Sequence, residues 1–326
     1  MKISIACTSF IICHFYLINV AAFQRRIIVT KKGHIPTNRS IPRLQERRIP
    51  ETSPEPKKFG ISASNFLNIA SSSVQILFRI GSGVFVNGYN LKIDDANSDE
   101  YSLFELFGKR PRETSKPMKV PKLPIEMYEF EGCPFCRKVR EAVHILDLDV
   151  MFYPCPRGGP TFRSKVIKQG GKAQFPYMID PNTKTSTYES DTIIKYLFDT
   201  YGAGSKVPFT LSSNALVTFS CGLGLIPRLG RGSKFEECKT AKQPLILWGY
   251  EASPFCKIVR ERLCELELAH LYKSCTRGSR KRDEMIKKTG YFQVPLLEDP
   301  NTNIVMYESE QIIEYLDKTY SYKVIV

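Results

Sequence analysis

One segment of the chain occurs twice. Residues 128–140 read YEFEGCPFCRKVR and residues 248–260 read WGYEASPFCKIVR, an offset of 120 residues. Self-similarity that continues for about 75 residues predicts two copies of one structural unit, and 326 residues is a length typical of about two domains. The further matches are Cys155-Pro-Arg157-Gly158 with Cys275-Thr-Arg277-Gly278, Gln174-Phe175-Pro176 with Gln293-Val294-Pro295, Asp180-Pro-Asn-Thr with Asp299-Pro-Asn-Thr, and Tyr188-Glu189-Ser190 with Tyr307-Glu308-Ser309.

Each copy predicts the same order of helices and strands. Apolar residues three and four positions apart follow residue 133, as expected for a helix with one buried face. The order βαβαββα with a mixed sheet predicts an α/β protein with two thioredoxin-like domains in tandem. In the first copy we expect strands at 125–130 and 150–153, helices from 133 and around 165–168, a hairpin over 177–188 and a last helix from 189.

A dithiol motif opens the first of these helices in one copy only. Cys133-Pro-Phe-Cys136 places Cys133 at the amino end of the helix, where free N–H groups and the dipole stabilise a thiolate. Such a thiol departs readily from a mixed disulfide, and Cys136, one turn further on, is placed to attack that intermediate. The alternative is a pair of buried cysteines without a redox role. In the second copy Ser253 replaces the first cysteine, while Cys256 is kept.

With these motifs, both copies resemble the N-terminal domain of glutathione transferases, and the first also resembles glutaredoxin through CPFC. As a tandem pair behind a targeting leader, the chain is similar to chloroplast thioredoxin-family proteins of plants and algae. The resemblance implies a first thioredoxin-like domain at 120–201, with CPFC, and a second at 244–326, with SPFC. It also implies a fold without the all-helical C-terminal domain of transferases, which has no counterpart in the sequence.

The same resemblance implies a glutathione site in each copy. Phe175-Pro176 would be the cis-proline loop that faces the cysteinyl unit, and Glu189-Ser190 would meet the γ-glutamyl carboxylate together with helix amides. An ordinary trans proline and a simple helix cap are the alternatives. Ser253 could donate a hydrogen bond to a glutathione thiolate, or Cys256 could remain as a less exposed thiol. The second-copy site residues are Ser253, Cys256, Val294, Pro295, Glu308 and Ser309.

These residues predict a glutathione-dependent thiol–disulfide oxidoreductase that acts through Cys133 and Cys136. Glutathione would be the co-substrate, and protein or small-molecule disulfides the partners. Two alternatives stay open. One is a non-catalytic glutathione-binding or protein-interaction module, and the other is a [2Fe–2S] carrier, since CPFC-type sites can hold a cluster between two chains. No metal ion site is expected, because the sequence has a single CxxC.

Upstream of each copy a shorter motif, R-x-G-x-G, follows an apolar stretch. The motif lies at 79–83 after the stretch 66–78, and at 228–232 after the stretch 211–226. Both stretches are too polar to span a membrane, and we expect each to form a helix packed on its own domain, within the segments 60–119 and 202–243.

The first copy also carries an insertion of about 29 residues near 90–118, whose charge predicts a mobile loop. Two repeated cysteines outside the dithiol motif, Cys155 and Cys275, are expected to be structural, with an accessory redox pair as the alternative.

The first 59 residues have the composition of a targeting leader. An apolar run ends in Val20-Ala21-Ala22, so 1–22 is predicted to be a signal peptide, with a membrane anchor as the alternative. The basic, acid-poor segment 23–59 is typical of a transit peptide, and the pair predicts import into a secondary plastid, with secretion as the alternative. The segment 23–59 contains ten Lys/Arg and three Glu, which together supply half of the net charge of +14. Once this leader is removed, no nucleic-acid partner and no stable membrane span are expected.

A reporter fusion tests the leader. Residues 1–60 fused to a fluorescent protein should direct it into the plastid of an alga with a secondary plastid, because both targeting signals are present. Phe23→Ala, at the junction of the two segments, should divert the reporter to the secretory route. Cytosolic fluorescence of the unmodified fusion would contradict the prediction.

Overall fold

The computed structural model describes residues 62, 65–95, 101–102, 104, 107–212 and 215–322. The predicted signal peptide (1–22) and transit segment (23–59) lie outside these ranges. Within the described ranges, no helix combines the length and the apolar character that crossing a membrane requires.

Both copies have the predicted βαβαββα order. Each copy has one parallel strand pair and two antiparallel pairs, so the expected mixed sheet and fold class are confirmed. The described residues contain no separate all-helical domain. The first copy consists of β3 (Ile125–Glu129), α3 (Pro134–Ile145), β4 (Val150–Pro154), α4 (Phe162–Gly170), β5 (Tyr177–Asp180), β6 (Thr185–Tyr188) and α5 (Ser190–Tyr201). The second consists of β7 (Leu245–Gly249), α7 (Pro254–Glu265), β8 (His270–Ser274), α8 (Lys281–Thr289), β9 (Leu296–Asp299), β10 (Ile304–Tyr307) and α9 (Ser309–Tyr320).

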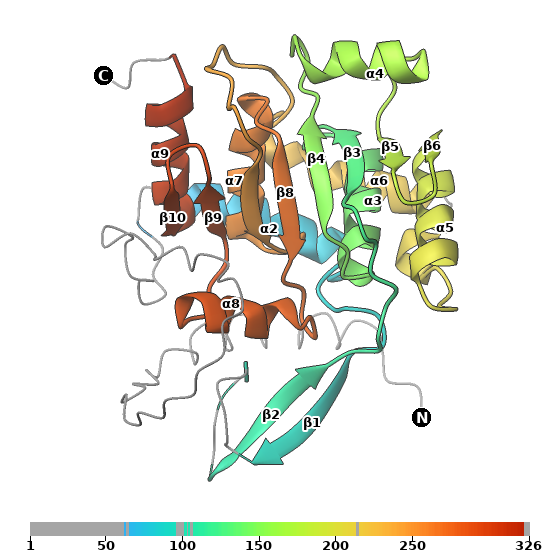
Figure 1. The fold of residues 1–326 in the computed structure, drawn as a ribbon, viewed down its shortest axis with the longest axis vertical. Coiled ribbons are helices and arrows are strands. Elements are labelled where there is room, and N and C mark those ends of the chain that lie inside the picture. Colours follow the sequence, from blue (N-terminus) through green and yellow to red (C-terminus); the bar gives the residue numbers. More distant parts are fainter. Residues whose placement is uncertain are drawn as a thin grey trace, which may run out of the picture.

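The two copies share one sheet. Its eight strands run in the order β10-β9-β7-β8-β4-β3-β5-β6, and the copies meet where β4 pairs antiparallel with β8 (Figure 1). At the centre of this pairing Met151 lies opposite Leu271, its own equivalent in the repeat. An approximate two-fold axis therefore passes between these residues. A single apolar cluster includes residues of both copies, so the two domains also share a core.

The upstream helices are exchanged between the domains. α2 (Phe66–Phe78), which precedes the first copy, packs on α7 of the second, and Ser72 Oγ donates to Pro254 O over 3.3 Å. α6 (Ala215–Leu223), which precedes the second copy, packs on α3 of the first. The expectation that each helix packs on its own domain is wrong. The apolar pattern that buries such a helix is satisfied equally well by the other domain, because the surfaces of α3 and α7 are repeats of each other.

The insertion forms a hairpin rather than the loop that its charge suggested. β1 (Asn90–Asp95) and β2 (Lys109–Thr114) pair antiparallel, and Figure 1 shows them beyond α8. Glu113 at the end of β2 is bonded to Arg277 and Arg282 of the second domain. The charge of Glu113 is thus neutralised by residues far away in the sequence, while most other charged residues of the hairpin are exposed as expected.

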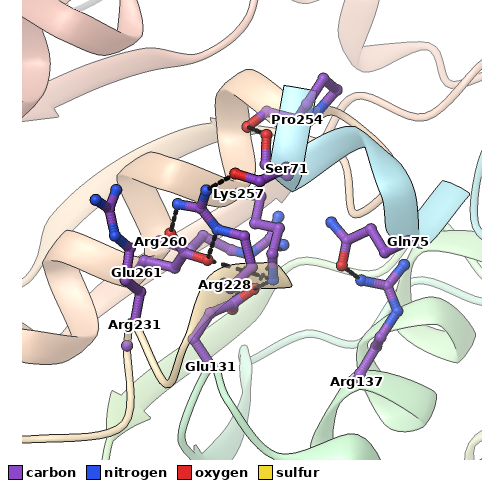
Figure 2. Close-up of polar contacts among 12 residues, drawn as sticks. Ser71, Gln75, Glu131, Arg137, Arg228, Arg231, Pro254, Lys257, Arg260 and Glu261 are labelled. Carbon is purple, nitrogen blue, oxygen red and sulfur yellow. Dashed lines mark hydrogen bonds and ion pairs between the residues drawn. The ribbon is translucent and has the colours of Figure 1, made fainter. Parts of the chain in front are cut away.

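Buried ion pairs across the axis join each of the helices α3 and α7 to the turn that precedes the other helix. Arg140 Nε lies 3.0 Å from Glu251 Oε2, and the equivalent Arg260 Nη2 lies 3.1 Å from Glu131 Oε1. Lys257 also reaches Glu131, as Figure 2 shows. Burial alone would raise the pKa of both glutamates, but the surrounding cations hold the pKa of Glu131 well below its usual range and lower that of Glu251 to about 2.

The R-x-G-x-G motifs complete this network. Arg79 Nη2 lies 2.6 Å from Glu141 on α3, and Arg228 Nη2 lies 2.5 Å from Glu261 on α7. Arg228 also donates to Ser71 Oγ of the exchanged helix α2 (Figure 2). The last glycine of each motif, Gly83 or Gly232, has a positive φ, which L side chains rarely adopt. At Gly232 a Cβ atom would also lie 2.7 Å from the Cβ atom of Glu131, so a side chain would not fit there without movement. Each motif therefore fastens an exchanged segment to the domain interface.

Removing one charge of this network should destabilise the whole chain. Glu131→Gln leaves Arg260 and Lys257 buried with reduced compensation, and we expect the free energy of unfolding to fall by about 3–5 kcal/mol. Asp199→Asn, in the exposed pair Lys195–Asp199, is the control and should cost less than about 1 kcal/mol. Urea titrations followed by circular dichroism measure both values, and equal losses would contradict the prediction.

Candidate redox and glutathione site

Cys133 is the N-cap residue of α3. The chain leaves β3 at residue 129, turns, and enters the helix at Pro134, whose missing N–H would have no helical partner in the first turn. The Cys133 sulfur accepts a hydrogen bond from the backbone N–H of Cys136 over 3.2 Å. A donor of this kind and the free end of the helix both stabilise negative charge on the sulfur. Cys133 is only 3% exposed, so little of its surface is open to a substrate in this conformation.

Cys136 lies deeper than Cys133. Its burial raises the pKa of the thiol well above its usual range, and the neighbouring Cys133 sulfur adds to this shift. The two thiols are therefore chemically unequal, since one sits at the amide-lined helix end and the other in the protein interior. This inequality suits a nucleophile followed by a second thiol that acts only on a mixed disulfide.

The proline loops lie beside the helix ends. The bonds Phe175–Pro176 and Val294–Pro295 are both cis, as the family resemblance implied. The Phe175 ring meets the ring of Phe130, in the turn before Cys133, edge-on at 6.1 Å between centroids. Phe175 and the cysteine turn are thus brought together, from segments that are more than 40 residues apart in the sequence.

Glu189 and Glu308 share an unusual backbone conformation. Their φ angles are 67° and 68°, in the left-handed region that non-glycine residues seldom adopt, and each immediately precedes a buried serine at a helix start. Neither glutamate side chain caps its own helix. Such strain costs about 1–3 kcal/mol and is retained mainly at functional sites, so its exact repetition favours a binding role for both pairs.

Two repeated glutamines connect the proline loops to these helix starts. Gln174 Nε2 donates to Glu189 Oε1 over 2.5 Å, and Gln293 Nε2 donates to Glu308 Oε1 over 2.6 Å. Sequence reasoning did not place these glutamines in the site. Their identity in both copies, directly before the residue that precedes the cis proline, was the signal that could have identified them.

The second domain keeps this framework without the nucleophile. Ser253 Oγ accepts from the N–H of Cys256 over 3.2 Å, which reproduces the geometry of Cys133 with a hydroxyl. Cys256 is completely buried, and burial raises the pKa of its thiol. Cys155 and Cys275 are also fully buried, packed against aromatic residues in small apolar clusters, which agrees with a structural role. All eight cysteines of the described ranges are free.

The insertion also covers part of the second domain. Tyr101 packs edge-on against Phe292, with 4.9 Å between ring centroids, and lies 4.8 Å from the guanidinium of Arg282. Phe292 precedes the cis proline by three residues, and Arg282 also lies 5.9 Å from the ring of Tyr250, three residues before Ser253. Because the insertion occurs only once, the approaches to the two sites differ although their frameworks match.

A family model of known proteins matches both copies of the repeat. Residues 127–205 and 247–323 each match the family model of the glutathione S-transferase N-terminal domain, and together they make up slightly less than half of the chain. No curated protein and no solved structure matches the chain significantly.

Proposed function

We propose that this chain, with its two tandem glutathione S-transferase N-terminal domains, is a glutathione-dependent thiol–disulfide oxidoreductase that acts through Cys133. The observation that carries the proposal is the difference between the two helix ends. Only the first has a cysteine at the N-cap of the helix with a second thiol one turn further on. The second domain has the same framework with a hydroxyl, which cannot form a disulfide.

The proposed reaction is an exchange of disulfides. The Cys133 thiolate attacks one sulfur of the substrate disulfide, a mixed disulfide forms, and the other substrate sulfur leaves as a thiolate that takes up a proton. Cys136 then attacks the Cys133 sulfur and releases the second substrate thiol. Two glutathione molecules return the Cys133–Cys136 disulfide to two thiols and become glutathione disulfide. The two electrons that reduce the substrate therefore come from glutathione.

The remaining site residues are proposed to hold glutathione. The backbone of Phe175, before the cis proline, would pair with the cysteinyl unit, as the family resemblance implies. Ser190 and the first amides of α5 would bind the γ-glutamyl carboxylate, since a helix amino end attracts an anion. The Gln174–Glu189 hydrogen bond supports this assignment because it joins the two parts of the site.

Substitution of each cysteine separates their roles. Cys133→Ser should abolish reduction of hydroxyethyl disulfide by glutathione, because the nucleophile is lost. Cys136→Ser should retain part of this activity, because a second glutathione can resolve the mixed disulfide. An assay coupled to glutathione reductase measures the rate of disulfide reduction for both variants. An active Cys133→Ser variant would contradict the proposed mechanism.

The second domain is proposed to bind glutathione without reducing disulfides, since it keeps Pro295, the strained Glu308 and the buried Ser309. Calorimetry on the full chain should then show two binding events. Ser190→Ala should weaken one of them and Ser309→Ala the other, each by about tenfold to a hundredfold, because a charge-assisted contact contributes about 1.5–3 kcal/mol.

Only Ser190→Ala should raise the KM for glutathione in the reductase assay. A single binding event that Ser309→Ala leaves unchanged would show that the second domain serves as a scaffold for the first. The full chain is needed for this experiment, because each domain contributes a strand and a helix contact to the other.

We also propose import into a plastid, which is supported only by the composition of residues 1–59.

A further inference from the structure

A pair of arginines lies next to each site. Arg157 and Arg163 of the first domain correspond to Arg277 and Arg282 of the second in the sequence repeat. We call them the first and the second arginine pair. Neither pair belongs to the dithiol motif, the proline loop or the serine that the proposed mechanism uses.

The backbone and the neighbouring carbonyl groups hold the two pairs in the same way. The N–H of Arg157 donates to Ser233 O over 2.7 Å, and the N–H of Arg277 donates to Val84 O over 3.0 Å. In each case the acceptor belongs to the segment that follows an R-x-G-x-G motif.

The second member of each pair is anchored through Nε. Arg163 Nε donates to the carbonyl groups of Cys155 and Pro156, at 3.0 and 2.7 Å. Arg282 Nε donates to those of Cys275 and Thr276, at 3.0 and 3.2 Å. The side chains of Arg163 and Arg282 are therefore anchored alike, and Arg157 and Arg277 occupy matching backbone positions.

The second arginine pair binds a carboxylate of the chain itself. Glu113 Oε1 accepts from Arg277 Nε over 2.6 Å, and Glu113 Oε2 accepts from Arg282 Nη1 over 3.4 Å. The Glu113 side chain is 1% exposed, so the pair removes this carboxylate almost completely from water. Glu113 lies in strand β2, which shows that the arrangement accepts an acidic side chain on an extended polypeptide.

The first arginine pair has no such neighbour in the part of the chain that the structure describes. The insertion that supplies Glu113 has no counterpart before the second copy. Arg157 is exposed, and within the described ranges neither arginine forms a hydrogen bond or ion pair with a carboxylate, although Glu267 is near enough to Arg163 for an electrostatic attraction. The nearby Glu267 of the second domain instead accepts from the backbone N–H groups of Thr161 and Phe162.

This pair lies on the approach to Cys133. The Arg163 guanidinium stacks on Phe175 at 4.8 Å and lies 5.8 Å from Phe130, the two rings that connect the proline loop to the cysteine turn. A carboxylate bound by Arg157 and Arg163 would therefore belong to a molecule that also reaches the redox site.

We propose that Arg157 and Arg163 recognise an acidic side chain of a protein substrate whose disulfide Cys133 reduces. Glu113 on the second pair is the chain's own example of such a ligand. This inference rests on the proposed function and adds a substrate class to it, namely polypeptide disulfides with a glutamate or aspartate near the oxidised cysteine.

Matched peptide substrates test the proposal. Two decapeptides carry one cysteine in mixed disulfide with glutathione, and four residues away they carry either Glu or Gln. The wild-type chain should favour the Glu peptide about threefold to tenfold in kcat/KM, the range for a partly exposed charge-assisted contact. Arg157→Gln should abolish this preference and leave the rate with hydroxyethyl disulfide unchanged.

Arg277→Gln is the matched control. This substitution removes the equivalent arginine of the second pair, which already binds Glu113. It should therefore lower the melting temperature of the chain but leave the preference for the Glu peptide over the Gln peptide unchanged. Two results overturn the proposal. One is a wild-type chain that does not distinguish the peptides, and the other is an Arg157→Gln variant that raises the KM for glutathione but keeps the preference, which would assign the pair to glutathione's own carboxylate.

A direct binding measurement separates this proposal from the redox function. Fluorescence anisotropy of the labelled peptides, with serine in place of cysteine, needs no turnover. Threefold or greater selectivity for Glu that Arg157→Gln removes would support the arginine site even if the chain reduced no disulfide. Equal binding of both peptides would reject the site whether or not the enzyme is active.

Discussion

The buried ion pairs between α3 and α7 are the interaction on which the rest of the structure depends. Arg140 and Arg260 each pair with a carboxylate of the opposite domain as well as with one of their own domain, and both lie in the interior. A charge in such a place is tolerated only when its partner is present, because the loss of hydration is otherwise uncompensated. Neither domain can therefore keep this face buried without the other, and the shared sheet and exchanged helices follow the same constraint.

The same network supports the redox helix from behind. α3 carries the two cysteines in its first turn and the interface charges Arg137, Arg140 and Glu141 in its middle. Its position is fixed by residues of the second domain as well as the first. This explains why the domain with Ser253 in place of the first cysteine retains its charged residues, since they hold the helix that begins at Cys133.

Much of the fold could be predicted from the sequence, because it depends on local signals. The order of elements and the helix start at Cys133 follow from patterns within about 20 residues, and the repeat follows from comparing the sequence with itself. The pairing of β4 with β8 could not, because an edge strand carries no mark of its partner. The burial of Glu113 was equally hidden, since a glutamate in a charged segment is normally exposed and its two arginines lie more than 160 residues away.

The exchanged helices have the form of a two-fold homodimer in which each subunit lends an element to the other. A single-copy ancestor with the same R-x-G-x-G segment would bury these charges by pairing with itself, and both of its active sites would have to be identical. Joining the two subunits in one chain removes that restriction. One half could then lose the cysteine at its helix start and the other acquire an insertion, so the covalent link is what permits two otherwise equivalent halves to differ.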